Sequence, residues 1–213
     1  MLQIEMLAVG PLEENTYLLM GEEGCILIDP GEEAERISSR IEELGKKPAL
    51  ILLTHGHFDH IGAANALRAR YGCPIAIGER DAEMLADPQK SLAGAANREK
   101  YCFSADRLLQ EGDTLEAAGL KVSILETPGH TRGSLSYLCE GCLFSGDVLF
   151  FGSAGRTDLY GGDYPELLET LRALMLLPED TAVYPGHGAS TSIGREKRSN
   201  PVVQAAEDYD SLY

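Results

Sequence analysis

The stretch that decides the fold is Thr54-His-Gly-His-Phe-Asp-His60, which follows an apolar run at residues 49–53. Two histidines separated by one residue cannot share a helical face, but they can point to the same side of an extended loop. Gly56 between them removes the side chain that would crowd a shared metal ion. Asp59 and His60 then open the next expected helix, and Asp59 can either cap that helix or bind metal. One short segment can therefore serve two adjacent ions.

The chain has five histidines, and the two outside this segment also follow expected strands. His130 comes after Pro128-Gly129 and His187 after Pro185-Gly186, so each strand fixes the direction of an imidazole that the glycine leaves uncrowded. Asp147 ends another expected strand, and its two carboxylate oxygens can bind one cation each.

These positions give seven candidate metal ligands: His55, His57, Asp59, His60, His130, Asp147 and His187. A single tetrahedral ion needs about four ligands, counting a water. The set is too large for one ion and suits two ions that share Asp147 and a bridging water. Cysteine is missing from the set, and nitrogen and oxygen ligands with open positions allow zinc, iron or manganese.

Composition and charge restrict the possible partners. The 213 residues suffice for one large domain or two small ones, and because no linker marks a boundary we expect one domain over residues 1–213. The net charge of −16 disfavours nucleic acid and anionic membranes as partners. The start of the chain has no basic patch before an apolar stretch, and no apolar run reaches membrane-spanning length, so we expect a cytoplasmic protein.

The five cysteines, without a secretory signal, indicate reduced thiols. Cys139-Glu-Gly-Cys142 has the spacing of half a zinc site, but a second such pair is missing from the sequence. The two cysteines flank a Glu-Gly turn between apolar runs, so a β-hairpin is the better interpretation.

Apolar periodicity predicts two groups of strands, each followed by helices. Strands are expected at residues 2–9, 16–20, 25–29, 49–53, 74–77, 114–116, 120–126, 134–139, 142–147 and 181–184. Helices are expected at residues 34–44, 61–71, 81–86 and 165–176. A turn at residues 13–15, a helix or excursion near the site at residues 88–105, and a polar, partly helical tail at residues 194–213 complete the chain. This pattern suits two packed sheets covered by helices, with ligands on loops at the strand ends.

Together these segments resemble the metallo-β-lactamase superfamily, whose signature is His-x-His-x-Asp-His followed by spaced His, Asp and His. The resemblance extends from about Asn15 to Pro201. It implies an α+β fold, a four-layer αββα metallo-β-lactamase sandwich. It also implies how the ligands divide: one ion would bind His55, His57 and His130, the other Asp59, His60 and His187, and Asp147 would bridge them.

Asp29, in Leu27-Ile-Asp-Pro-Gly31, matches the first motif of the superfamily. The resemblance implies that Asp29 orients the histidine loop from behind without binding metal. The same Asp-Pro-Gly segment is also typical of a turn that ends a strand, and both interpretations can hold together.

Within the superfamily the chain is similar to glyoxalase II-type hydroxyacylglutathione hydrolases. Three segments carry the similarity: Ser145-Gly-Asp-Val-Leu-Phe150, Gly155-Arg-Thr-Asp158 and Gly194-Arg-Glu-Lys-Arg-Ser-Asn-Pro201. The longer enzymes carry a C-terminal helical extension that helps to hold glutathione. This chain stops soon after Pro201, so it resembles the short form of the family.

The resemblance implies a binuclear hydrolase that cleaves small-molecule thioesters, S-lactoylglutathione for example, through a metal-bridging hydroxide. Zinc is the expected metal, with iron or manganese as alternatives. Asp59 would orient the hydroxide or accept its proton as the catalytic carboxylate. Arg156 is a candidate contact for an anionic substrate group. Arg195, Lys197 and Arg198 form a basic cluster that could meet glutathione carboxylates or belong to a solvated tail.

Other activities fit the same motifs. A mononuclear iron persulfide dioxygenase shares the histidine motif and the Gly-Arg-Thr-Asp segment but binds one iron through His, His and Asp. Lactone hydrolysis is a third possibility. A catalytically silent binding module is disfavoured because a decayed site would be expected to lose ligands. RNA cleavage is disfavoured by the net charge of −16.

Overall fold

The central strands of this chain are apolar on both faces. In the computed structural model, which describes residues 2–94 and 98–209, Leu18 and Leu27 point to one side of the first sheet. Their neighbours Leu19 and Ile26 point to the other side. Because successive side chains of a strand alternate between faces, a sheet of this kind needs a covering layer on each side.

The strands of the N-terminal half of the chain form the first sheet. Its order is β1 (Gln3–Val9), β2 (Glu14–Gly21), β3 (Gly24–Ile28), β4 (Pro48–Leu52), β5 (Ile75–Gly78) and β6 (Arg107–Leu109). The first three strands pair antiparallel, and β3 to β6 pair in parallel. The carboxyl ends of β3, β4 and β5 therefore lie at one edge of the sheet.

The second sheet is mixed as well. Its order is β14 (Thr191–Ser192), β13 (Ala182–Pro185), β10 (Cys142–Gly146), β9 (Leu135–Cys139), β8 (Leu120–Glu126) and β7 (Thr114–Ala117). Strands β10 and β13 are parallel, and the other pairs are antiparallel. A small hairpin, β11 (Leu149–Phe150) with β12 (Ser153–Ala154), follows β10.

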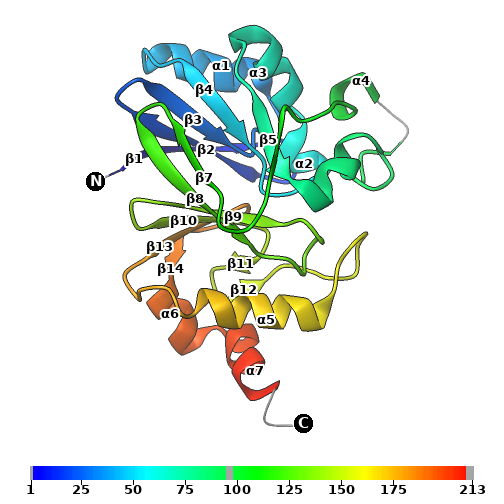
Figure 1. Cartoon of the computed structure of the whole chain (residues 1–213), viewed down its shortest axis with the longest axis vertical. Coiled ribbons are helices and arrows are strands. Elements are labelled where there is room, and N and C mark those ends of the chain that lie inside the picture. Colours follow the sequence, from blue (N-terminus) through cyan, green and yellow to red (C-terminus); the bar gives the residue numbers. More distant parts are fainter. Residues whose placement is uncertain (1, 95–97, 210–213) are drawn as a thin grey trace.

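Helices cover the outer faces of both sheets. The helical elements are α1 (Ala34–Glu43), α2 (Phe58–Ile61), α3 (Ala64–Tyr71), the 3-10 helix η1 (Glu79–Leu85), α4 (Arg98–Tyr101), α5 (Tyr164–Leu174), α6 (Ile193–Ser199) and α7 (Pro201–Tyr209). Helices α1 and α3 pack on the first sheet, while α5, α6 and α7 pack on the second. Figure 1 shows the resulting order of layers, with the two sheets stacked face to face in the middle.

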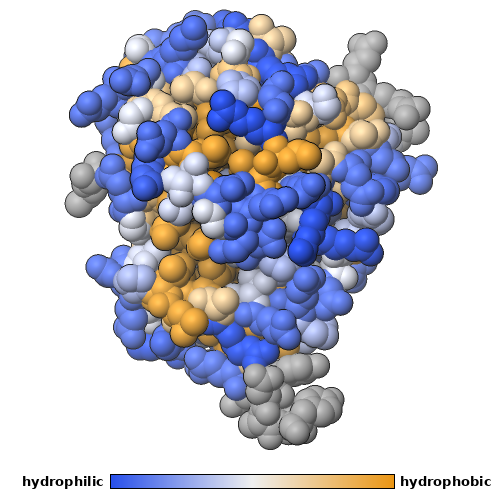
Figure 2. Space-filling model, in the orientation of Figure 1, coloured by the Kyte–Doolittle hydropathy of each residue, from blue (hydrophilic) through white to orange (hydrophobic). Residues whose placement is uncertain are grey.

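The layer between the sheets is a hydrophobic core. Tyr17 and Leu52 of the first sheet meet Val122, Tyr137 and Phe144 of the second, and all of them are buried. Tyr17 and Phe144 make an edge-on ring contact with centroids 5.3 Å apart. The expected four-layer αββα sandwich is confirmed. On the face of the molecule that Figure 2 shows, hydrophilic side chains cover much of the surface and apolar side chains gather in a few places.

One edge of this sandwich collects the loops that carry the motifs. The loops after β4, β8, β10 and β13 all leave the sheets on this side, as the strand directions require. Leu135 donates its backbone N–H to the carbonyl of Thr54 (2.8 Å), and the Tyr137 hydroxyl donates to the carbonyl of Leu53 (2.6 Å). The two sheets are thereby joined directly beneath the histidine loop.

The helix expected at residues 61–71 is two helices. Helix α2 begins at Phe58, so Asp59 lies inside its first turn, and His57 is the N-cap residue without a side-chain cap. Asp59 therefore does not cap the helix. The helix is interrupted at Gly62 because Ala63 donates its N–H to the carbonyl of Pro30 (2.9 Å) and not to a carbonyl of the preceding helical turn. A Cβ at Gly62 would lie 2.3 Å from the carbonyl oxygen of Gly31, so the close approach requires glycine.

Other boundaries also differ from the expected ones. The expected turn at residues 13–15 overlaps β2, which begins at Glu14, and the sequence does not predict the short strands β6, β11, β12 and β14. Strands of two or three residues carry too little alternation to be recognised. Part of the expected segments 88–105 and 194–213 lies outside the described residues.

The Cys139–Cys142 hairpin is confirmed. The two cysteines face each other in register at the ends of β9 and β10, and the turn between them has positive φ at Glu140 (47°) and Gly141 (77°). Two successive residues in the left-handed region are typical of the tightest hairpin turns. Within the described residues, no helix is long and apolar enough to cross a membrane.

Candidate metal centre

The seven candidate ligands come together at the edge of the sandwich where the strands end. Three polypeptide segments that are far apart in the sequence join the Thr54–His60 loop there: His130 after β8, Asp147 after β10 and His187 after β13. Among the seven candidates, two groups of three residues have ligand atoms that all lie within 4.8 Å of one another, and a further such group joins Asp29 to His55 and His60. The first group is His55, His57 and His130, and the second is Asp59, His60 and His187.

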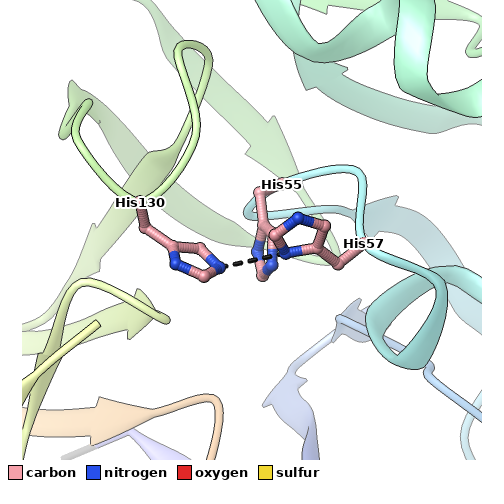
Figure 3. Close-up of side chains that lie close together, drawn as sticks. All are labelled: His55, His57 and His130. Carbon is pink, nitrogen blue, oxygen red and sulfur yellow. Dashed lines mark hydrogen bonds between the residues drawn. The ribbon is translucent and has the colours of Figure 1, made fainter. Parts of the chain in front are cut away.

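The first group is buried. Nδ1 of His57 lies 3.0 Å from Nε2 of His130, the contact drawn in Figure 3, and the ring of His55 stands edge-on to both. Figure 3 shows the three rings converging from two loops on one point. Such a cluster of imidazole nitrogens is typical of sites for zinc and related cations.

Asp147 connects this first group with the second. Its Oδ2 lies 3.8 Å from Nε2 of His130 and 3.6 Å from Nε2 of His187, while Oδ1 lies 3.4 Å from Nε2 of His60. Asp59 completes the second group, with Oδ2 3.3 Å from Nε2 of His187. The carboxylate of Asp147 thus stands where an anion can be shared by cations in both groups.

Four of the five imidazoles are held from behind through Nδ1. The carbonyls of Arg156 and Leu12 accept from His130 (2.7 Å) and His187 (3.1 Å). The Thr54 hydroxyl accepts from His55 (3.0 Å), and the Asp29 carboxylate accepts from His60 (2.9 Å). Because these acceptors hold the hydrogen on Nδ1, Nε2 of each neutral ring carries a lone pair. This tautomer follows from the acceptors, because a carbonyl or a carboxylate can only accept and the Thr54 hydroxyl already donates to Asp29. Each Nε2 is then ready to bind a cation.

Asp29 is the anchor of the histidine loop. Its Oδ1 accepts the N–H of Thr54 (2.7 Å), and its Oδ2 accepts the Thr54 hydroxyl (2.6 Å) and Nδ1–H of His60 (2.9 Å). Both oxygens of Asp29 are therefore engaged in hydrogen bonds that hold the loop and His60. The residue also forms the expected turn, with φ of 46° before Pro30, so both interpretations of the Asp-Pro-Gly segment fit the structure.

The polar atoms at the centre of the site need a partner that the protein does not supply. Nε2 of His55, His57 and His60 and Oδ1 of Asp147 are buried and without a hydrogen-bond partner. A buried polar group left unsatisfied costs about 1–3 kcal/mol, so several in one place are rare in native proteins. The carboxylate oxygen is an electron-pair donor and a neutral imidazole offers one lone pair, so divalent cations are partners that these residues can share. The residues present therefore fit a metal centre.

Burial and mutual charge set the protonation of the cluster. Burial holds the pKa of His55 well below its usual range and, together with the charge of His130, lowers the pKa of His57 to about 3. Burial alone would lower the pKa of His60 too, but the charges of Asp147 and Asp59 outweigh it and raise that pKa. Burial alone would raise the pKa of Asp147, yet the charge of His60 lowers it overall. The raised pKa of His60 therefore means that a proton competes with a cation for this imidazole.

A cavity of about 500 Å³ opens onto the site. Its lining combines the polar residues of the centre with an apolar wall: His57, Asp59, His130, Asp147, His187 and Arg156, with Leu12, Phe58, Leu92, Phe150 and Leu159. This volume is within the range of cavities that hold small molecules. A substrate in the cavity would contact both ligand groups.

The predicted substrate-binding residues have different positions. Arg156 lines the cavity, but its guanidinium makes a two-pronged contact with Asp158 at 2.7 Å for each nitrogen–oxygen pair. Arg195 lies over the ring of Phe151, 3.4 Å from its centroid, and Lys197 points to the carbonyl of Met175 (3.5 Å). Neither Arg195 nor Lys197 is among the described residues that line the cavity, so the geometry gives their predicted role no support.

Asp81 is a functional candidate that the sequence did not reveal. Its carboxylate is buried and accepts hydrogen bonds from the N–H of Gly56 (3.2 Å), the N–H of Gly133 (2.8 Å) and the hydroxyl of Thr131 (2.6 Å). It thus joins the loop of His55 and His57 to the loop of His130. In the sequence, Asp81 looks like an ordinary acidic residue at the start of a helix, and no local signal distinguishes it.

Glu14 is a second such residue. Its side chain is fully buried, and Oε1 has no hydrogen-bond partner while lying 3.9 Å from Nδ1 of His60. Burial raises the pKa of Glu14 well above its usual range, which the charge of His60 only partly offsets. The next residue also contacts the last ligand loop, because Asn15 donates its side-chain amide to the carbonyls of Pro185 (3.0 Å) and Gly188 (2.9 Å).

Comparison with known proteins agrees with this geometry. The sequence profile of the metallo-beta-lactamase superfamily matches residues 9–187. The hydroxyacylglutathione hydrolase GloC of Haemophilus influenzae is 40% identical over 212 residues, which cover 96% of this chain and 99% of GloC. The chain therefore belongs to the metallo-β-lactamase superfamily.

Two solved structures extend the comparison. The BLEG-1 B3 metallo-beta-lactamase has a TM-score of 0.89 and 37% identity, over 94% of this chain and 99% of that protein. The di-iron-bound form of TTHA1623 has a TM-score of 0.80 and 37% identity, over 92% of this chain and 98% of that protein. The chain is thus a metallo-hydrolase relative in which the His/Asp cluster implies divalent metals.

Divalent metal should stabilise this protein, and the stabilisation should grow with pH. The raised pKa of His60 means that a proton must leave before metal binds, so binding is weaker at low pH and stronger at high pH. Zinc at about 100 times its dissociation constant adds about 2.7 kcal/mol, which corresponds to roughly 5–10 °C in Tm for a chain of this size. Thermal melts with and without zinc, at about pH 5.5 and about pH 7.5, measure both effects. Equal zinc-dependent shifts at the two pH values would contradict the account.

Replacing Asp81 by alanine should loosen the first ligand group. Three buried donors lose their acceptor, which we expect to cost about 2–4 kcal/mol of unfolding free energy and at least about tenfold in zinc affinity. Urea unfolding and competitive zinc titration measure the two effects, and Asp180→Ala, at an exposed position, is the control. Wild-type zinc affinity in a destabilised Asp81→Ala protein would show that Asp81 only supports the fold.

Proposed function

We propose that this protein is a binuclear metal-dependent hydrolase that cleaves small-molecule thioesters, S-acylglutathiones among them. The observation that carries the proposal is the pair of complete ligand groups joined by Asp147 at the floor of one cavity. A single ion would leave one group of buried donors unsatisfied. The similarity over nearly full length to GloC, whose name is hydroxyacylglutathione hydrolase, supports thioesters as the substrate class.

Two bound cations would supply an activated water and polarise the carbonyl of the substrate. Asp59 faces the cavity, and although burial alone would raise its pKa, the charge of His60 lowers it overall. An ionised carboxylate at this position can accept a hydrogen bond from the attacking water and take its proton. Phe58 and Phe150 line the cavity beside the ligand groups.

The nitrogen and oxygen donors suit zinc, and equally iron or manganese. We propose zinc as the resident metal, because four-coordinate sites with open positions are its usual catalytic arrangement. The similar protein TTHA1623 has been crystallised in a di-iron-bound form, so iron is the first alternative to test in this chain.

A second candidate activity is a mononuclear iron persulfide dioxygenase, and a third is lactone hydrolysis. The completeness of the second ligand group, Asp59 with His60 and His187, favours the binuclear hydrolase over the dioxygenase. Oxygen uptake with glutathione persulfide on the iron-loaded protein, compared with hydrolysis of a lactone and of S-lactoylglutathione on the zinc-loaded protein, separates the three. Thioester hydrolysis without oxygen uptake is the result we expect.

Replacing His55 or Asp147 by alanine should abolish metal binding and thioesterase activity together. Each substitution removes a donor from the buried cluster, and we expect kcat/KM to fall by more than about 100-fold. The assay follows S-lactoylglutathione hydrolysis alongside metal content, with Asp180→Ala as the control that keeps both. Full turnover of the thioester by a metal-depleted variant would refute the assignment.

A further inference from the structure

Much of the cavity wall is apolar, although catalysis at a metal centre does not itself require an apolar wall. Five hydrophobic side chains from five separate segments surround the opening, and we call them the apolar rim: Leu12, Phe58, Leu92, Phe150 and Leu159. Leu12 is 51% exposed and Leu92 is 40% exposed. The rim adjoins the reacting centre, because the ring of Phe150 packs edge-on against that of His187 with centroids 6.4 Å apart.

The backbone holds part of this rim in a conformation that is unfavourable for its residue. Leu92 has φ of 64°, in the left-handed region that leucine rarely adopts. The adjacent backbone is fixed to the histidine segment, because Phe58 donates its N–H to the carbonyl of Ser91 (2.8 Å). Strained residues concentrate at ligand-binding segments, and Leu92 is strained where it lines the cavity.

Charged groups around the cavity are poorly arranged for a glutathione carrier. Glutathione has two carboxylates, yet Arg156 is the only arginine or lysine among the described lining residues. Its guanidinium is already matched by Asp158, and this contact lowers the pKa of Asp158 to about 2. The cavity therefore offers much apolar surface and little free positive charge.

We infer that the substrate is a thioester with an apolar acyl group of several carbons, which lies against the apolar rim, and that the thiol carrier is recognised only weakly. This inference rests on the proposed thioesterase function and specifies which half of the substrate the site selects. Apolar surface removed from water stabilises the bound acyl chain in proportion to its length, whereas a small polar lactoyl group leaves the rim in contact with water.

The test measures kcat/KM on the zinc-loaded full chain for acetyl, butyryl, hexanoyl and octanoyl thioesters. Each acyl group is presented on glutathione and on N-acetylcysteamine, a thiol without charge. We expect kcat/KM to rise by at least about tenfold from acetyl to hexanoyl, since a fully buried methylene contributes up to about fourfold. Exchange of the carrier should change kcat/KM by less than about threefold, the size expected for a weak exposed charge contact.

Variants of the rim connect the effect to the structure. Leu92→Asn removes the apolar side chain while keeping a residue that tolerates positive φ, so the backbone is preserved. This variant should lower the octanoyl-to-acetyl ratio of kcat/KM by about fivefold or more. Leu176→Asn, at a position that is 86% exposed and outside the cavity lining, should keep the wild-type ratio. Thermal melts check that both variants are folded.

Three outcomes decide the matter. A rise with acyl length that Leu92→Asn weakens supports the inference. Thioester cleavage that is flat with acyl length, or that falls more than about tenfold when glutathione is replaced, overturns the inference while leaving the thioesterase function intact. If the protein cleaves none of the thioesters in the series, the proposed function is overturned, and the inference with it.

Discussion

The structure depends on the hydrogen bonds that hold Nδ1 of four imidazoles and so turn each Nε2 toward a common centre. Asp29 is the most important of the acceptors, because it fixes both Thr54 and His60 at the head of the histidine loop. Backbone carbonyls serve His130 and His187. Every one of these bonds is made by a group of the protein itself, which favours a preorganised ligand cage.

The sandwich fold makes this preorganisation possible. Two sheets with strand ends at the same edge bring segments more than 100 residues apart within hydrogen-bonding distance, as the contact of Asn15 with Pro185 shows. Core packing between Tyr17 and Phe144 holds the sheets in register below the site. The cost of the arrangement is a cluster of buried donors without partners, which is acceptable only because a cation can satisfy them.

Much of this site could be predicted from the sequence, and the reason is local. The His-x-His-x-Asp-His segment and the Pro-Gly-His turns can be recognised as metal-ligand motifs, because the type and spacing of the ligands are fixed within a few residues. Asp81 and Glu14 could not be found, since their roles arise from contacts between segments far apart in the chain. The sequence left two interpretations open for Arg195 and Lys197, a contact with glutathione or a solvated tail, and neither residue is among the described residues that line the cavity. The four layers were predictable through the family resemblance, whereas the short strands were not.

The central claim is a paired cation centre, and the most direct measurement is metal stoichiometry together with metal position in crystals of the zinc-loaded protein. The account predicts two ions per chain, about 3.5–4 Å apart, with Asp147 between them. One ion bound to His55, His57 and His130 alone, with Asp59 and His187 turned to solvent, would contradict it.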